Sequence, residues 1–360
     1  MAGNTFGRFL ALTSFGESHG KGVGGVLDGF PAGIPIDMDF IRNQVRKRRT
    51  GIHPSGSPRI EGDEVEFLSG IRNGQSTGAP IAFWIQNTDV SHTAHQEGVL
   101  RPSHASYTYW KKYGFYDYDG GGRASARETV IRVVGGALAA LLLHREGVGV
   151  FAFTRQIGPV ALDVPTSAIE PEAVSASRML CPDPAVTDAM EEYLLRMRKE
   201  GDTTGAMVSC KASGLPTGLG DPVFAKLSSD LAAAMMGINA AKAFEYGSGM
   251  NSASKRGSEL NDLYTRDFHT ITNHSGGIQG GISNGEPLCF NVAFKPVPGI
   301  MRDQPSINEQ GEEALLESFG RHDVCVAPRV VPVVEAMASL VLADHLLMNN
   351  AYQFYRYSEK

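Results

Sequence analysis

The chain has 360 residues, of which 42% are hydrophobic and 20% are charged, and its formal net charge is −6. These values are typical of a soluble globular protein with a large core, and the negative charge argues against a general nucleic-acid binder. The four cysteines lie far apart without a CxxC pair, which favours reduced thiols in a cytosolic enzyme over disulfides or zinc. The sequence predicts neither a signal peptide nor a membrane-spanning segment.

The first part of the chain is predicted to form short strands and one capped helix. Asp37 is expected to cap this helix, whose last turn is the basic run Arg46–Arg49. Basic residues there complement the helix dipole, but four in a row exceed that need and leave at least one as a candidate ligand of a phosphate. A glycine-rich segment at 16–20 follows the first strand, and the expected strands cover residues 6–15, 23–27, 65–68 and 81–85.

The segment from 101 to 132 has the features of a helix whose N-terminus binds an anion. Three glycines, Gly120–Gly122, precede a predicted apolar helix over residues 130–143. Ser125 followed by Glu128 is the capping-box pattern of a helix start. Backbone N–H groups point outward there, and the helix dipole favours a negative charge.

Charged side chains make an anion site the better interpretation of this segment, although three glycines could also be a plain flexible loop. Guanidinium groups bind phosphate and carboxylate groups in bidentate fashion, and the stretch carries His104 together with Arg101, Arg123 and Arg127. A metal site is not expected, because the neighbouring His92 and His95 lack a third ligand of the usual kind.

The second half of the chain is predicted to mix helices and strands. Asp221-Pro222 is expected to start a long helix that ends near Phe244, and Asn308 to cap another that ends at Phe319. Residues 245–285 are expected to be an irregular loop, either functional or disordered, whose glycine pairs favour close approach to a ligand. The other expected helices cover 187–200 and 330–348, and the strands cover 151–160, 206–212 and 288–294.

These patterns predict an α+β fold in one large domain that covers residues 1–360. Helices and strands do not alternate regularly, which argues against a doubly wound sheet. Glycine-rich, charge-bearing segments are spread from residue 16 to residue 323 and would have to converge to form one site. No GxGxxG motif lies between a strand and a helix, so a Rossmann dinucleotide site is not expected.

Several long and unusual segments resemble the chorismate synthase family, and the resemblance covers nearly the whole chain. Three carry most of it: GESHGKGVGGVLDGFPAG at 16–33, RPSHASYTY with GGGRASARET at 101–109 and 120–129, and GRHDVCVAPR at 320–329. The segments MMGINAAKAFE and NHSGGIQGGISNG and the pair Lys295-Pro296 match as well, in the family's order.

The resemblance implies an activity that the residue patterns alone do not. Members of the family convert 5-enolpyruvylshikimate 3-phosphate into chorismate by a 1,4-anti elimination of phosphate and a ring proton. This carbon–oxygen lyase reaction belongs to the shikimate pathway of aromatic amino acid biosynthesis, and it requires reduced FMN without net redox change. The resemblance also implies helices sandwiched between two antiparallel sheets, a cytoplasmic homotetramer, and an external flavin reductase that uses NADPH to supply reduced FMN.

The resemblance assigns roles to individual residues. His19 and His104 match two histidines credited with proton transfer, and Asp323 matches an aspartate near flavin N5. The substrate carries a phosphate and two carboxylates, which suits guanidinium groups. The residues implied to bind substrate are Ser18, Arg48, Arg101, Arg127 and Arg321. The residues implied to bind FMN are Arg123, Ala124, Ser125, Asn239, Ala240, Gly280, Lys295 and Arg321.

Three positions depart from the family pattern. Ser106 stands where the family often has Asp, and Ala124 stands where it often has a second Ser. Residues 52–54, which end in Pro54, lack a basic residue that some members carry, and Arg59 is a candidate replacement. An active enzyme is still expected, because the candidate catalytic residues are unchanged.

Two other functions remain as alternatives. The first is a flavin-dependent oxidoreductase acting on an anionic metabolite, which would consume NADPH in proportion to product. The second is a non-catalytic anion- or nucleotide-binding protein, which would not need two histidines and an aspartate in three separate glycine-rich segments.

Overall fold

Two antiparallel five-stranded sheets form the frame of the protein in a computed structural model that describes residues 3–49, 62–88, 96–318 and 323–353. The first sheet has the order β1-β2-β3-β7-β4, with β1 Thr5–Phe6, β2 Ala11–Gly16, β3 Gly22–Asp28, β7 Ile81–Gln86 and β4 Glu66–Phe67. The second has the order β11-β14-β10-β8-β9, with β11 Ala241–Tyr246, β14 Leu288–Phe294, β10 Ala206–Ser213, β8 Gly149–Ile157 and β9 Val160–Ala161. The α+β class predicted from the sequence is confirmed.

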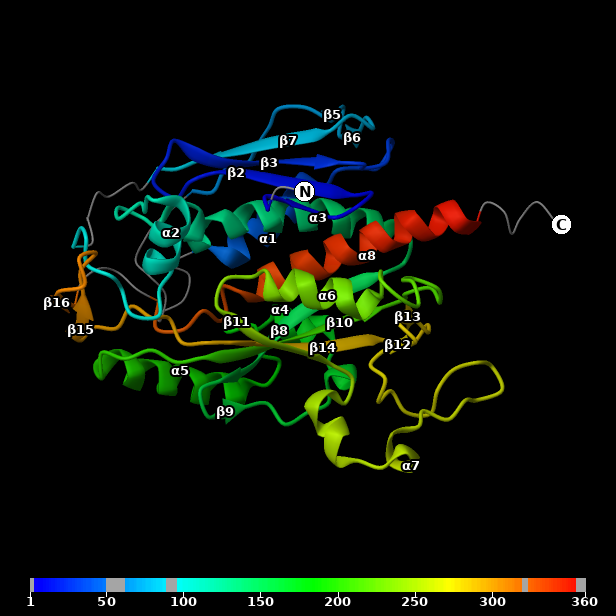
Figure 1. The fold of residues 1–360 in the computed structure, drawn as a ribbon. Coiled ribbons are helices and arrows are strands. Elements are labelled where there is room, and N and C mark those ends of the chain that lie inside the picture. Colours follow the sequence, from blue (N-terminus) through cyan, green and yellow to red (C-terminus); the bar gives the residue numbers. More distant parts are fainter. Residues whose placement is uncertain (1–2, 50–61, 89–95, 319–322, 354–360) are drawn as a thin grey trace.

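In Figure 1, helices lie between these sheets: α1 Met38–Arg48, α3 Thr129–Arg145, α6 Leu227–Met236 and α8 Val331–Gln353. Helices α3 and α8 approach closely at Gly136. A Cβ there would lie 2.3 Å from the Cα of Ala336, so the close approach requires glycine. One core cluster contains buried residues of both sheets and of all four helices. The segments that carry the candidate site are therefore held by a common hydrophobic core.

Helix α8 has the length and apolarity of a membrane-spanning helix, but it is a core helix. Of its most apolar stretch, 83% is buried inside the protein. Its neighbours are α3, α6 and β8, so its apolar side chains already have protein partners.

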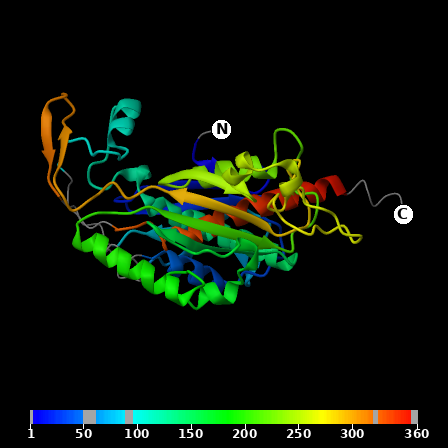
Figure 2. The ribbon, with the colours of Figure 1, turned by 90° about the horizontal axis from the view of Figure 1, so that it is seen from below.

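A helix and a hairpin project from one end of the layers, as Figure 2 shows. They are α2, Ser106–Tyr113, and the pair β15 Gln304–Ile307 and β16 Glu313–Leu316. Leu100 N donates to Ile307 O at 2.9 Å, and the Tyr118 hydroxyl donates to Glu309. These bonds join the hairpin to the two segments that flank α2, and His104 lies just before that helix.

The remaining elements are short or lie outside the layers. Helix α5, Pro184–Lys199, begins where the side chain of Asp183 caps it. The others are β5 Ile71–Arg72, β6 Gln75–Ser76, α4 Pro171–Ser175, α7 Gly257–Leu260, β12 Ile278–Gln279 and β13 Ile282–Ser283. The 245–285 stretch is thus irregular, as predicted, apart from the end of β11, one short helix, a 3-10 turn and one small hairpin.

Local patterns located the first helix correctly but not the first strand. Asp37 Oδ1 accepts from the backbone N–H of Asp39 and Phe40, so the predicted cap of α1 is confirmed. The single strand predicted over 6–15 is wrong, because the chain leaves the sheet between β1 and β2. The backbone N–H groups of residues 8–10 donate instead to the carboxylate of Asp344 in α8.

The long helix predicted over 221–244 is wrong as well. Residues 221–226 form a turn, and α6 occupies only the middle of the range. Ala240 has a φ of +67°, a left-handed conformation that cannot continue a helix. The chain then enters β11, which satisfies its backbone groups by pairing with β14.

The helix predicted to begin at Asn308 is the β15–β16 hairpin. The Asn308 side chain accepts from the backbone N–H of Gln310 and Glu312 and so closes the turn. An Asn side chain can cap a helix or close a turn with the same kind of hydrogen bond, so this residue could not distinguish the two structures.

Replacing Asp344 should weaken the whole fold. Asp344→Ala removes the acceptor of three backbone N–H groups, at Arg8, Phe9 and Leu10, and should lower the free energy of unfolding by about 3 kcal/mol. Urea unfolding of the purified protein measures this change. The exposed Asp188, paired with Arg178 on the surface, supplies a control, and Asp188→Ala should change stability far less.

Candidate active site

His19 lies on the tight connection between β2 and β3, where its ring packs against a glycine. The Ser18 hydroxyl donates to Gly120 O at 2.8 Å and lies 3.2 Å from His19 Nδ1. A Cβ on Gly120 would lie 1.6 Å from that same nitrogen, so only glycine leaves room for the imidazole. The first glycine of the 120–122 segment therefore fixes the place of the first candidate histidine.

These contacts also set the tautomer of His19. A hydroxyl has one proton, and that of Ser18 is donated to the carbonyl of Gly120. Toward His19 the Ser18 oxygen accepts, so Nδ1 of His19 carries a hydrogen. Nε2 is then the nitrogen that gains or loses a proton in acid–base chemistry.

His104 lies beside the next glycine of the same segment. A Cβ on Gly121 would be 3.8 Å from its ring. His104 Nδ1 is 3.2 Å from the Tyr116 hydroxyl, and Nε2 is 3.5 Å from Arg101 Nη1. Because a guanidinium only donates, Nε2 of His104 accepts here. Burial lowers the pKa of Arg101 and raises that of Tyr116, so this histidine lies in a partly desolvated environment.

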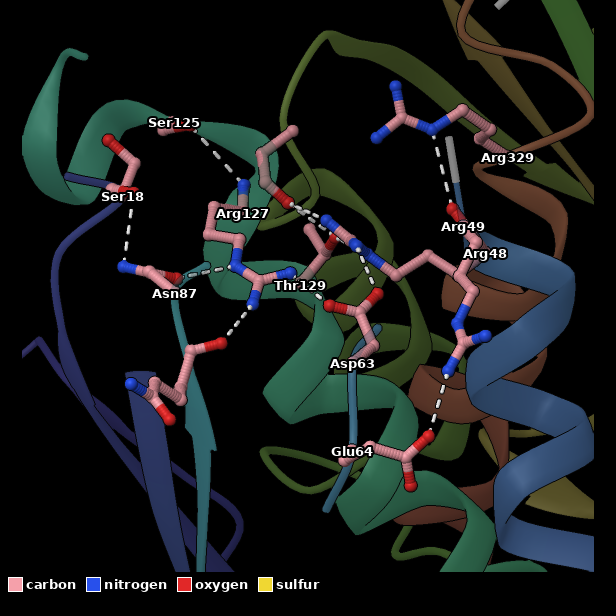
Figure 3. A network of polar contacts seen from close by, with 12 residues as sticks. Ser18, Arg48, Arg49, Asp63, Glu64, Asn87, Ser125, Arg127, Thr129 and Arg329 are labelled. Atoms are coloured by element: carbon pink, nitrogen blue, oxygen red, sulfur yellow. Dashed lines mark hydrogen bonds and ion pairs between the residues drawn. The ribbon is translucent and has the colours of Figure 1, made fainter. Parts of the chain in front are cut away.

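A buried carboxylate joins two arginines behind the His19 loop, as Figure 3 shows. Asp63 Oδ1 pairs with Arg127 Nη1, and Asp63 Oδ2 lies 3.7 Å from Arg48 Nη1. The side chains of Asp63, Arg127 and Arg48 are only 1%, 3% and 5% exposed. The backbone of Asp63 has a φ of +48°, a left-handed conformation that Asp tolerates better than most residues.

Both arginines direct further N–H groups into the protein. Arg127 Nε donates to Asn87 Oδ1 at 2.9 Å, and Arg48 Nε donates to Thr129 Oγ1 at 2.9 Å. Arg48 Nη2 donates to Ala126 O at 2.7 Å. The structure therefore places these two predicted substrate ligands in the wall of the site, where they brace the start of α3 and the end of β7.

Asp323 enters the same network through Arg329. The two side chains form an ion pair, and Arg329 Nε donates to the backbone carbonyl of Arg48 at 3.3 Å. Burial, followed by the like charge of Arg329, lowers the pKa of Arg48 to about 9. Among the described residues, Arg48 lies near the like charges of Arg329 and Arg127 as well as the carboxylates of Asp63 and Glu128, and burial disfavours its charged form, so an additional anion nearby would stabilise it.

Four of the residues implied to bind FMN form one group. Asn239 Nδ2 donates to Ala124 O at 3.0 Å, and Lys295 N donates to Ala240 O at 2.9 Å. Lys295 Nζ donates to Ser103 O at 2.6 Å, which connects this group to the residue before His104. Burial, followed by the nearby charge of Lys242, lowers the pKa of Lys295.

One atom of this group suits a cofactor that donates a hydrogen bond. Asn239 Oδ1 is buried and has no hydrogen-bond partner among the residues that the structure describes. A buried acceptor without a donor is destabilising, and such atoms in native proteins call for an explanation. The ring N–H of a flavin is a donor of the required kind, so the residues present fit the group that the resemblance implies.

Arg123 and Ser125 form hydrogen bonds that hold the chain around the site. The Arg123 guanidinium donates to Gly16 O and to Ser14 Oγ and so holds the end of β2. Ser125 Oγ accepts from the N–H of Arg127, two residues on. The predicted capping box is wrong, because Glu128 pairs with Arg132 and a 3-10 turn at 126–128 precedes α3.

Gly280 does not join the FMN group within one molecule. It lies in the exposed turn of the β12–β13 hairpin, and the next residue, Gly281, accepts from Leu227 N at the start of α6. Asn239 follows the other end of α6, and a helix of this length, ten residues, spans about 15 Å. In Figure 1 this hairpin and α2 lie at opposite ends of the protein.

An open cavity of about 490 Å³ lies in front of His19, and Trp84, Gln86 and Asn87 are among its other lining residues.

Of the positions that depart from the family pattern, Ser106 is buried, and its hydroxyl accepts from Arg101 N at 3.1 Å. Some of the predicted positions lie outside the described residues: Arg321, His92, His95, Arg59 and 52–54.

Sequence reasoning missed Asp63, Asn87, Tyr116 and Arg329 as residues of the site. Arg329 closes the GRHDVCVAPR segment, and Tyr116 lies in the aromatic run after His104, so both had a signal nearby. Asp63 and Asn87 follow ordinary stretches, and only their distant partners reveal them.

An α+β fold that gathers two histidines at one glycine segment, against a buried arginine network, has the architecture of an enzyme that handles an anionic ligand. The family model described as chorismate synthase matches residues 10–347. The chorismate synthase of Bacteroides fragilis is 48% identical over 355 residues, covering 97% of this chain and 99% of that protein. That of Phocaeicola vulgatus is 49% identical over the same length and coverage.

A solved crystal structure of chorismate synthase aligns with a TM-score of 0.77 and 28% sequence identity, and the alignment covers 98% of each chain. The chain belongs to the chorismate synthase family.

The contact between Gly120 and His19 can be tested by adding one methyl group. Gly120→Ala would place a Cβ 1.6 Å from His19 Nδ1 and displace the ring. A displacement of about 1 Å in an active site can lower turnover by about 10²-fold, which is the loss expected here in a chorismate assay. Gly149→Ala, where a Cβ would meet nothing within 4 Å, is the control and should keep normal activity.

Proposed function

We propose that this chain is a chorismate synthase that converts 5-enolpyruvylshikimate 3-phosphate into chorismate. The reaction is a 1,4-anti elimination of phosphate and a ring proton, with reduced FMN as the required cofactor. One observation carries the proposal. His19 and His104 lie beside neighbouring glycines, and buried arginines lie in the wall of the same site. The family's arrangement of helices sandwiched between two sheets is part of the same proposal, and the layers of Figure 1 support it.

The charge of the site suits a substrate with one phosphate and two carboxylates. Arg101 lies beside His104 and is the described guanidinium best placed to contact the substrate. Arg48 and Arg127 act from the wall, where their surplus positive charge favours an anion in the cavity. Ser18 belongs to the proposed substrate residues through the family motif, and its buried hydroxyl holds Gly120 and His19 in place. Arg321 completes the proposed substrate residues on the basis of the family motif.

Reduced FMN, when bound, would supply an electron-rich ring beside the substrate. Asn239 Oδ1 would accept a hydrogen bond from it, and the backbone at Ala124 and Ala240 and the side chain of Lys295 would border it. Arg123, Ser125 and Arg321 belong to the proposed binding residues through the family motif. Gly280 belongs to them on the same basis, although the described residues place it at the far end of α6.

The two histidines have different partners and are proposed to move different protons. His19 Nε2 would donate to the departing phosphate oxygen, since Nδ1 is held by Ser18. His104 would act on the cofactor side, because Lys295 of the FMN group holds the residue before it. Asp323 would act as a base near the cofactor and is held by Arg329. Histidine suits both proton transfers because the unperturbed pKa of an imidazole, about 6.5, lies near working pH.

We further propose a cytoplasmic homotetramer that receives reduced FMN from a separate flavin reductase, with NADPH needed only by that reductase. Large apolar side chains stand exposed on the surface of the single chain, and they support burial against further copies. The most exposed are Phe224 at 94%, Phe268 at 86% and Met250 at 80%.

A single assay separates the proposed function from its alternatives. The protein, mixed without oxygen with 5-enolpyruvylshikimate 3-phosphate and chemically reduced FMN, should form chorismate, followed by absorbance, without consuming NADPH. In air with NADPH and FMN but no reductase, almost no chorismate should form. Product made only in step with NADPH consumption would support an oxidoreductase, and ligand binding without product would support a binding protein.

The roles of the histidines predict a selective loss of turnover. His19→Ala and His104→Ala should each lower turnover by about 10²-fold or more, the usual scale for general acid–base groups, while FMN still binds. His92→Ala and His95→Ala should have little effect by comparison. Near-normal turnover of both active-site variants between about pH 6 and 8 would show that the protons move by another route.

A further inference from the structure

The side chain of Asn87 is inserted into the loop that carries His19. Asn87 follows the last residue of β7, and the residue is 6% exposed. Its Nδ2 donates to the backbone carbonyls of Glu17, Ser18 and Gly20, at 2.9, 3.1 and 2.8 Å. Three carbonyls on both sides of His19 thus converge on one amide, as the Asn87–Ser18 contact in Figure 3 illustrates.

The orientation of this amide is set by Arg127. Asn87 Oδ1 accepts from Arg127 Nε at 2.9 Å, and a guanidinium can only donate. If the amide flipped, its NH₂ group would face Arg127 and its oxygen would face three carbonyls, so neither side could form a hydrogen bond. Arg127 is itself held by the buried carboxylate of Asp63. The ion pair therefore selects the one orientation that holds the loop.

We propose that Asn87, oriented by the Arg127–Asp63 pair, is the positioning residue that sets where His19 presents its imidazole; this inference rests on the proposed role of His19. Asn87 and His19 also line the same open cavity, so a shift of the loop would move the histidine relative to a ligand there. Arg127 then acts on the reaction through Asn87 and not by binding the substrate directly.

Asn87→Asp tests the donor side of the amide with almost no change in shape. The carboxylate still accepts from Arg127 but presents an oxygen to three carbonyls. With the full-length protein and reduced FMN, kcat should fall by about 10²-fold, because the histidine is displaced, while KM should stay within about a factor of two. The rate at which diethyl pyrocarbonate modifies His19, followed by peptide mass spectrometry, should rise severalfold, because the loop no longer holds the ring.

Asn291→Asp is the matched control. Asn291 lies in β14, and its amide donates to Glu245 and accepts from Ser209, so the same exchange of atoms removes one partly buried donor from the other sheet. It should leave kcat and the modification rate of His19 unchanged. The inference is wrong if Asn87→Asp folds and keeps both quantities at the wild-type values, or if only KM changes.

Arg127→Lys provides a second route if Asn87→Asp does not fold. Lysine can still pair with Asp63, but it lacks the Nε donor that orients Asn87. Lower kcat at constant KM, with faster modification of His19, supports the inference, and higher KM at constant kcat would make Arg127 a direct substrate ligand. The modification rate requires no turnover, so it tests Asn87 even if no chorismate forms, a result that would reject only the proposed function.

Discussion

A single buried carboxylate connects the parts of the site that come from distant segments of the chain. Asp63 pairs with Arg127, which orients Asn87, and it lies beside Arg48, whose carbonyl accepts from Arg329. Loss of either charge would leave a buried partner uncompensated, at a cost of about 3–5 kcal/mol. The placing of both the His19 loop and the Asp323 segment therefore depends on an ion pair in the wall behind them.

The two histidines share one glycine segment but not one environment. His19 Nδ1 has a neutral hydroxyl as a partner, whereas His104 faces a guanidinium and a phenol. The two imidazoles therefore have different hydrogen-bond partners, which suits them to different roles in one reaction. His19 packs against Gly120 and His104 lies beside Gly121, and Ser18 and Arg101 then give the two rings different partners.

Local signals in the sequence predicted the elements that depend on neighbouring residues. The capped start of α1, the strands in the middle of both sheets and the apolar helix α8 belong to this class. The helix expected over 221–244 is limited to α6, because a turn precedes it and the left-handed backbone of Ala240 follows it, and an alanine gives no local signal for that conformation. Asp63 and Asn87 are 64 and 40 residues from Arg127, so no local pattern could have indicated them.

The carboxylate of Asp344, near the end of the chain, accepts the backbone N–H groups that separate β1 from β2 near its beginning. A ribosome releases the strands of this first sheet before the helix that fastens them, because 334 residues separate Leu10 from Asp344. Until α8 has emerged, part of the apolar face of this sheet stays uncovered. A chain that terminates before α8 would lack both this fastening and the centre of the core, so completion of α8 is a condition for a stable fold.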